Sequence, residues 1–231
     1  MDRLLREGRL QDGRRVDILI TEGLISDVAE SGSAPIDGVE VDNLSGWLVL
    51  PAMAEPHAHL DGALTAEMVP NHRGDLAGAI EAGIAAARAG VITYEGIVKR
   101  AIRAIELLMV RGVTAVRSHV GVGAGVGATS VLAVQEARSH FEGLIDIQLV
   151  ALTHSPMTGV DGVGNRAALV EAVEAGVDLV GGTPHLDPDG PGLIKNAIAV
   201  ATDAGIGIDL HVDETLDPSV LTLRDFARQV Q

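Results

Sequence analysis

Residues 47–61 read WLVLPAMAEPHAHLD, an apolar run that stops at two histidines, His57 and His59. Four later apolar runs stop in the same way, at His119, His154, His185 and His211. The carboxyl ends of parallel strands meet at one edge of a sheet, and in a (β/α) barrel the loops at that edge form one shared mouth. The recurrence therefore predicts parallel strands with an active site at their carboxyl ends.

The spacing of the apolar runs predicts a parallel α/β fold. Strands are expected near 47–54, 113–119, 146–152, 178–182 and 206–212. Helices are expected near 76–88, 95–111, 128–141, 165–175 and 192–204, with a further one beginning near Pro218. Continuous apolar strands joined by helices are typical of βαβ units. Gly112, Gly176 and Gly205 stand where three of these helices should end with a left-handed cap.

About five βα units are predicted, fewer than a closed (β/α)8 TIM barrel of roughly 250 residues contains. An open half-barrel would leave a strand edge unpaired and half of its interior side chains in water. We therefore expect residues 49–231 to form a partial (β/α)8 barrel, the N-terminal portion of a longer chain, with a doubly wound open sheet as the alternative. The β-prone stretches 14–20, 23–29 and 38–42 predict a small sheet without chemistry over residues 1–48.

The composition argues against several classes of partner. The formal charge of −15 repels phosphate backbones and anionic lipid headgroups, and the basic residues are scattered, so neither nucleic acid nor a membrane is expected. The first residues, MDRLLRE, carry acidic and basic side chains where a signal peptide would need an apolar stretch, which predicts a cytoplasmic protein. The chain has no cysteine, so any metal must be held by imidazole and carboxylate groups.

The histidine pair has a spacing that suits metal binding. His57 and His59 are two residues apart, so on a strand their imidazoles point to the same side and can bind one ion. His211, at the end of the fifth run, can supply a third nitrogen at the same mouth. Glu214 is close enough to exchange protons with a substrate and is our candidate general acid/base. The alternative is that Asp213 and Glu214 open a solvated loop and cap the helix that follows.

Five segments of the chain resemble the amidohydrolase superfamily, and within it the cytosine deaminase branch, which includes deaminases of triazine rings. They are LPAMAEPHAHLD at 50–61, 112–120, 145–151, 176–185 and DLHVDE at 209–214, in the family's order over nearly the whole chain. The resemblance implies a (β/α)8 barrel whose accompanying β-sandwich is built from both ends of the chain, its first part being residues 1 to about 48. It also implies that His57, His59 and His211 bind one divalent ion, zinc or iron, and that Glu214 passes a proton to a ring nitrogen of the substrate.

The implied reaction is metal-assisted hydrolysis, in which an activated water replaces the amino group of a small cyclic amidine or aminoheterocycle. Members specific for cytosine have a glutamine after the third strand that binds the pyrimidine edge. Here His154 takes that position, so we expect it to bind the substrate. Imidazole cannot donate and accept hydrogen bonds in the pattern of an amide. Cytosine itself is therefore not the expected substrate, and hydrolysis of a cyclic amide or an alkylamino-triazine is an alternative chemistry.

The main alternative to an enzyme is a catalytically incomplete barrel fragment or a non-catalytic scaffold. In the family, a histidine after the sixth strand and an aspartate after the eighth complete the site, and no position here can receive them. The 231-residue chain alone is therefore expected to turn over nothing. The expected partner of the intact enzyme is a small heterocyclic molecule, and a homo-oligomer is left open.

The remaining histidines carry weaker signals. His119 and His185, together with Arg117, are expected either to line the pocket or to have a structural role. His72 and His140 lie outside the recurring pattern and are expected to face solvent.

Overall fold

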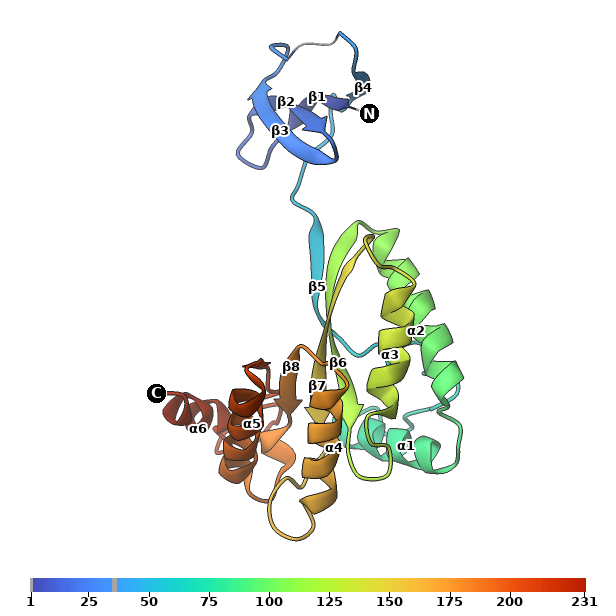
Figure 1. Cartoon of the computed structure of the whole chain (residues 1–231), viewed down its shortest axis with the longest axis vertical. Coiled ribbons are helices and arrows are strands. Elements are labelled where there is room, and N and C mark those ends of the chain that lie inside the picture. Colours follow the sequence, from blue (N-terminus) through green and yellow to red (C-terminus); the bar gives the residue numbers. More distant parts are fainter. Residues whose placement is uncertain (1, 35–36) are drawn as a thin grey trace. The chain divides into compact units, whose positions relative to one another are not determined.

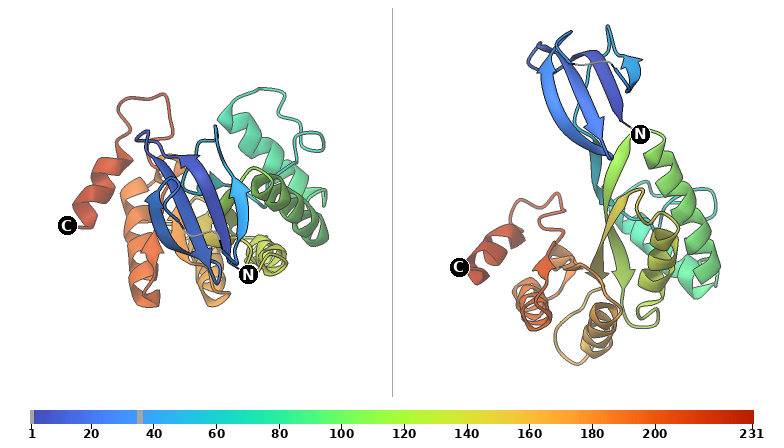
Figure 2. Two further views of the ribbon diagram at one scale, coloured as in Figure 1. Left: turned by 90° about the horizontal axis from the view of Figure 1, so that it is seen from above. Right: turned by 45° about the horizontal axis from the view of Figure 1, so that its top comes forward.

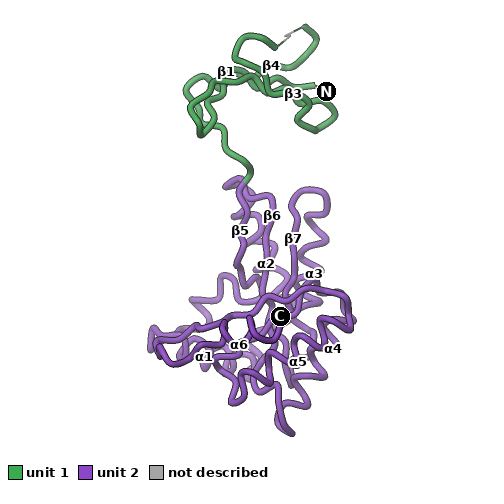
Figure 3. Tube along the Cα trace, turned by 90° about the vertical axis from the view of Figure 1, so that its left-hand side faces the viewer, with its two compact units in different colours: residues 1–52 green, residues 53–231 purple. Residues whose placement is uncertain are grey.

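The computed structural model describes residues 2–34 and 37–231. The chain divides into two compact units, residues 1–52 and 53–231, which Figure 3 colours green and purple. Among the described residues, no helix combines the length and the apolar character that crossing a membrane requires.

The first unit contains a four-stranded sheet. Its strands are β1 (Arg3–Arg9), β2 (Arg15–Thr21), β3 (Leu24–Glu30) and β4 (Glu40–Asn43), in the spatial order β3-β2-β1-β4. Strand β2 pairs antiparallel with β1 and β3, whereas β4 lies parallel to β1. Leu4, Val16 and Ile18 are its buried apolar residues. Strand β1 was not predicted, because four of its seven residues are charged and interrupt the apolar pattern.

Asp17 is a buried carboxylate in this sheet, with a relative exposure of 1%. Its oxygens accept hydrogen bonds from the backbone N–H of Glu7 at 3.0 Å and of Gly32 at 2.8 Å. Burial alone would raise the pKa of Asp17, but these N–H groups and the guanidinium of Arg6 outweigh burial and hold the pKa below its usual value of 3.8. The fold therefore stabilises the charged form of this carboxyl.

We expect the stability that Asp17 provides to be lost in acid. A carboxyl whose pKa is lower in the folded than in the unfolded state stabilises the fold above the unfolded pKa, and this contribution disappears as the pH falls through the folded pKa. The difference in free energy of unfolding between the wild type and D17N should therefore be largest above about pH 5 and shrink steadily below it. Denaturant unfolding of both proteins at a series of pH values measures the difference, and a constant difference would contradict the assignment.

The second unit is built around a parallel five-stranded sheet in the order β5-β6-β7-β8-β9. The strands are β5 (Met53–Ala58), β6 (Val113–Val122), β7 (Asp146–Thr153), β8 (Leu179–Gly182) and β9 (Gly207–Ile208). The helices are α1 (Leu76–Arg88), α2 (Tyr94–Met109), α3 (Thr129–Ser139), α4 (Val163–Glu174), α5 (Gly190–Ala204) and α6 (Thr222–Gln229). Chain order and spatial order of the strands agree, as in a barrel wall, whereas the strand order of a doubly wound sheet reverses at a switch point.

Alternate residues of the strands face opposite sides of the sheet. Val116 and Val120 of β6 and Leu149 of β7 pack into one core with residues of α2 to α5. Figures 1 and 2 show these helices arranged around the outside of the sheet. Arg117 and His119 alternate with the core valines of β6, so their side chains point to the opposite, helix-free side.

Helix α2 illustrates why the helices cover that face. The hydroxyl of Thr93 accepts a hydrogen bond from the N–H of Gly96 at 3.1 Å, which caps the first turn. The buried residues Ile97, Ala101 and Ile105 recur at one-turn intervals and form a single apolar stripe. The stripe can be buried only against the sheet and the neighbouring helix.

The sheet is strongly curved. Strands β5 and β9 are its two outer strands, four strand spacings apart, which would be about 19 Å in a flat sheet. Nevertheless, Nε2 of His57 in β5 lies 3.2 Å from Nε2 of His211, which follows β9. Arg117 of β6 likewise reaches Asp209, with Nη1 2.8 Å from Oδ2. Side chains from such distant strands meet only when a sheet curls into part of a barrel, so the predicted partial (β/α)8 fold is confirmed.

The boundaries of the predicted helices agree closely with the structure. The predicted range 76–88 coincides with α1, and α2 to α5 begin and end within two residues of the prediction. Gly112, Gly176 and Gly205 have φ angles of 82°, 91° and 68°, the left-handed conformation predicted for the chain at these helix ends.

Strand β5 begins and ends later than the strand predicted near 47–54. Pro51 has no N–H to donate to a ladder, and around Pro56, for the same reason, the register of β5 with β6 shifts. His57 therefore lies inside β5, and His59 follows the strand directly.

Candidate metal centre

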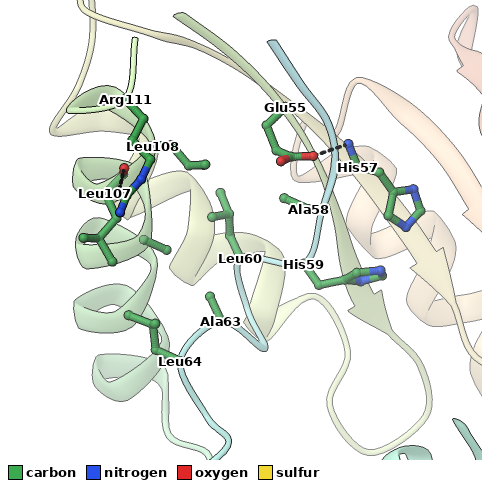
Figure 4. Close-up of a pocket in the computed structure, with 11 residues that line it drawn as sticks. Glu55, His57, Ala58, His59, Leu60, Ala63, Leu64, Leu107, Leu108 and Arg111 are labelled. Atoms are coloured by element: carbon green, nitrogen blue, oxygen red, sulfur yellow. Dashed lines mark hydrogen bonds between the residues drawn. The ribbon is translucent and has the colours of Figure 1, made fainter. Parts of the chain in front are cut away.

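Four imidazoles meet on the concave side of the curved sheet. His57 belongs to β5 and His59 follows it, while His119 lies in β6 and His211 follows β9. The centroids of these rings are between 4.4 and 5.6 Å apart. Figure 4 shows His57 and His59 pointing away from α2, whereas Leu60 lies on the side of that helix. The fold thus gathers ring nitrogens from three strands at one place.

The spacing of the nitrogens suits a single metal ion. His57, His119 and His211 each offer one ring nitrogen, and these nitrogens all lie within 4.8 Å of one another. Two nitrogens bound to one tetrahedral zinc at its usual bond lengths are about 3.3 Å apart. The 3.2 Å between Nε2 of His57 and Nε2 of His211 matches that separation. His59, the other ligand expected from the sequence, lies beside these three rings, with its ring centroid 5.2 Å from that of His57, but its nitrogens are not part of this closely spaced group.

The protonation states of two rings favour metal binding. Burial, and then the neighbouring rings of His119, His57 and His59, lower the pKa of His211 to about 4. Burial likewise lowers the pKa of His119. Both imidazoles are therefore neutral at neutral pH and keep a lone pair for a ligand.

His119 is the most deeply enclosed ring of the cluster. It is fully buried, and within the described residues neither of its ring nitrogens has a hydrogen-bond partner. Its Nε2 lies 3.4 Å from Oδ1 of Asp209, a contact that is close but poorly aligned for a hydrogen bond. Buried polar atoms without partners are rare in folded proteins and commonly mark a site for a ligand or an ion. The residues present therefore fit a divalent metal.

An ion pair supports the cluster from the same concave face. Oδ2 of Asp209 accepts a hydrogen bond from Nη1 of Arg117 at 2.8 Å, and Nε of Arg117 donates to the side chain of Gln148 at 2.9 Å. Burial would raise the pKa of Asp209, but Arg117 and His119 outweigh it and lower the pKa. No role was predicted for Asp209, although it lies only two residues before His211 in the extended segment that follows β9.

Glu214 and Asp213 have different surroundings. The side chain of Glu214 is 48% exposed, and its Oε2 lies 3.9 Å from Nε2 of His185. Oδ1 of Asp213 accepts a hydrogen bond from the hydroxyl of Thr222 at 2.8 Å and bonds the N–H of the same residue, at the start of α6. Asp213 therefore has the helix-capping role that was the alternative for both carboxylates. Glu214 has no such contact with the described residues of α6, so its carboxylate is free to act as an acid or a base.

His154 lies at the rim, beyond His119 along the concave face. Its ring packs directly against Gly121 and Gly123, which have no side chain in the way. A Cβ atom added at Gly123 would lie only 2.5 Å from Nδ1 of His154, and one added at Gly121 would lie 3.3 Å from its Nε2. Oδ2 of Asp61 accepts a hydrogen bond from the N–H of Gly121 at 2.9 Å. An imidazole and a carboxylate thus lie side by side at the mouth.

The other sequence candidates are placed as follows. The side chain of His185 is 1% exposed and bonds to the backbone of His211, while Arg117 belongs to the ion pair with Asp209. His72 and His140 are exposed, as predicted.

A pocket of about 370 Å³ lies on the other side of β5, against α2 (Figure 4). Its lining is mostly apolar and includes Leu60, Leu107 and Leu108; His57 and His59 also border it, although their rings point away from α2. A site for an aminoheterocycle needs several converging polar groups. We therefore place the functional site on the concave side, where the ring nitrogens converge.

Comparisons with known proteins identify relatives along nearly the whole chain, although no protein-family model matches it. The chain is 31% identical over 216 residues to a pterin deaminase of Rhizobium rhizogenes, covering 94% of this chain and 48% of that protein. It is 27% identical over 218 residues to N-isopropylammelide isopropyl amidohydrolase of a Pseudomonas species, covering 90% of this chain and 53% of that protein. The chain thus spans about half the length of the curated relatives it matches.

A solved structure shares the fold over almost every residue. The crystal structure of 5-methylcytosine deaminase from Klebsiella pneumoniae with 5-fluorocytosine is 28% identical, with a TM-score of 0.84, and the match covers 99% of this chain and 55% of that one. The relatives, the curved parallel sheet and the histidine cluster agree with the resemblance found in the sequence. The chain belongs to the amidohydrolase superfamily, among the relatives of its cytosine-deaminase-like enzymes.

Proposed function

We propose that the protein is a metal-dependent hydrolase that removes the amino group of a small cyclic amidine or aminoheterocycle. The observation that carries the proposal is the 3.2 Å separation of Nε2 of His57 and Nε2 of His211, which come from the two outer strands of the sheet. The relatives support the reaction class, since two of them are deaminases of pterin and of 5-methylcytosine.

In this proposal His57, His59 and His211 hold one divalent ion. Imidazole suits both zinc and iron, and the absence of cysteine leaves nitrogen and oxygen as donors. When bound, such an ion lowers the pKa of a coordinated water toward about 7 and so supplies a nucleophile at neutral pH. His119 lies against the three rings, with its Nε2 3.4 Å from Oδ1 of Asp209, and Arg117 holds that carboxylate in place.

Glu214 is the general acid/base of the proposal. Hydrolytic deamination adds water to the amino-bearing ring carbon, places a proton on the adjacent ring nitrogen, and breaks the C–N bond so that ammonia leaves. The carboxylate of Glu214 takes the proton that the attacking water loses, gives it to the ring nitrogen, and later helps to protonate the leaving amine. Its position three residues beyond His211 and its partial exposure allow it to reach both the rings and a substrate at the mouth.

His154 binds the edge of the substrate in this proposal. Its ring lies over Gly121 and Gly123 at the mouth, where a heterocycle would approach the histidine cluster. An imidazole offers one donor and one acceptor on opposite sides of its ring, unlike the paired donor and acceptor of an amide.

We expect H154Q to change substrate preference more than overall activity. A buried hydrogen bond lost or gained is worth about 1 to 2 kcal/mol, which corresponds to roughly a tenfold change in the ratio of two specificity constants. The ratio of kcat/KM for cytosine to that for the best substrate of the wild type should rise by about this factor. An unchanged ratio would exclude His154 from the substrate pocket.

The direct test combines metal analysis with product detection. The full gene product is purified, its zinc and iron are measured, and ammonia release is followed with pterin, cytosine, isocytosine, creatinine and aminotriazines. We expect one ion per chain and release of ammonia from at least one of these compounds. Bound metal without turnover of any of them would refute the deaminase and favour a non-catalytic scaffold.

A second candidate reaction is hydrolysis of an alkylamino group. The observation that favours it is the similarity to N-isopropylammelide isopropyl amidohydrolase, a relative that matches 90% of this chain. The same ligands and the same acid/base would serve, with an amine in place of ammonia as the leaving group. Release of isopropylamine from N-isopropylammelide, measured beside ammonia from the other compounds, distinguishes the two reactions.

The net charge of −15 supports small-molecule partners over nucleic acid or membrane lipid. A cytoplasmic location is part of the same proposal, and localisation of a tagged full-length protein would test it. Its oligomeric state can be measured by light scattering of the same preparation.

A further inference from the structure

His185 is a buried histidine that the proposed reaction does not use. It lies in the short 3-10 helix η1 (Pro184–Leu186) that follows β8, and its side chain is 1% exposed. Nδ1 of His185 lies 3.1 Å from the carbonyl oxygen of His211. The N–H of His211 in turn donates to the carbonyl of Gly182 at 3.0 Å. Both backbone groups of His211 are therefore held by β8 and the segment that follows it.

These contacts fix the tautomer of His185. A carbonyl oxygen can only accept a hydrogen bond, so Nδ1 of His185 must carry the proton. The other nitrogen of the neutral ring, Nε2, is then a hydrogen-bond acceptor. Nε2 is buried and has no hydrogen-bond partner within the described residues. It faces Oε2 of Glu214 at 3.9 Å.

The acceptor is complementary to the acid form of Glu214, whose O–H can donate to it. The side chain of Glu214 is 48% exposed, so it can rotate at little cost. A shift of about 1 Å would bring the two atoms to the usual hydrogen-bond separation of roughly 2.8 Å. Catalytic hydrogen bonds are often long before the substrate binds and tighten in the complex.

We propose that His185 is a positioning residue that ties His211 to Glu214. Its Nδ1–H holds the backbone carbonyl of His211, and its Nε2 accepts the proton-bearing oxygen of Glu214 while that residue is in its acid form. The second half of this proposal rests on the proposed function of Glu214, whereas the first half concerns only the placement of His211. A single buried ring thus sets the distance between a metal ligand and the acid that works beside it.

Two substitutions separate the two contacts. Asparagine at position 185 can keep an N–H donor near the place of Nδ1, and glutamine can place an amide near the position of Nε2. We expect H185N to retain its metal affinity and to lose about 10- to 100-fold in kcat with little change in KM. H185Q should bind metal about tenfold more weakly and, when saturated with zinc, keep more of its kcat than H185N.

His140 provides a matched control, because its Nδ1 also lies 2.9 Å from a backbone carbonyl, that of Glu136, but on an exposed helix end. H140N and H140Q should match the wild type in zinc affinity and in kcat. Equal zinc affinities of H185N and H185Q would show that His185 does not position His211. A kcat of H185N equal to that of the wild type would show that His185 does not position Glu214. If the wild type releases neither ammonia nor amine, the proposed function fails, while zinc titration of the two His185 variants still tests the tie to His211.

Discussion

Replacement of His211 by alanine in the full gene product is expected to abolish stoichiometric metal binding and to lower kcat/KM by roughly 10³-fold. A bound ion contributes several kcal/mol to the stability of the transition state, and 1.4 kcal/mol corresponds to a factor of ten. His211 is the residue through which the outer strand β9 reaches the outer strand β5, and its Nε2 lies 3.2 Å from Nε2 of His57. Without its ring, the remaining nitrogens come from β5 and β6 alone. Zinc and iron content after dialysis, measured together with turnover, tests the expectation.

The same measurement on the other histidines distinguishes ligands from supporting rings. We expect H57A and H59A to lose the metal as H211A does. H119A should bind it about 10- to 100-fold more weakly, because the ring of His119 packs against those of His57 and His211. H72A, at an exposed position outside the cluster, should match the wild type. Full metal content in H59A together with complete loss in H119A would instead make His57, His119 and His211 the ligand set.

Local patterns account for most of the predicted fold. Helix α1 occupies its predicted range because its apolar residues have helical spacing and Asp75 caps it by accepting a hydrogen bond from the N–H of Gly78 at 2.7 Å. Strand β1 was missed because charged residues interrupt its apolar pattern, and its pairing with β2 and β4 is a long-range property. Strand β5 begins later than predicted because hydropathy does not register that Pro51 lacks an N–H, and it continues through Pro56 with a shift in its register against β6.

The site was predictable only in part, for a physical reason. Apolar runs that end in histidine indicate which residues lie at strand ends, and this pattern includes the four histidines of the cluster, His57, His59, His119 and His211, together with His154 and His185. The ion pair of Arg117 with Asp209 joins residues 92 positions apart in the chain and depends on how tightly the sheet curls. Curvature is set by packing across the whole sheet, so no local pattern predicts that these two side chains meet.

The second large effect is expected for E214Q, which should lower kcat by about 10² to 10⁴-fold while the metal content stays that of the wild type. Glutamine has the shape of glutamate but can neither take a proton from water nor give one to a ring nitrogen. The carboxylate is 48% exposed and lies beside His185, so its replacement should leave the fold intact.

The neighbouring carboxylate provides the control, because Asp213 caps α6 through Thr222. D213N should lower the free energy of unfolding, because the cap of α6 is weakened, and leave kcat within a few-fold of the wild type. Loss of metal in E214Q would make Glu214 a ligand, and a wild-type kcat in E214Q would mean that another group moves the proton.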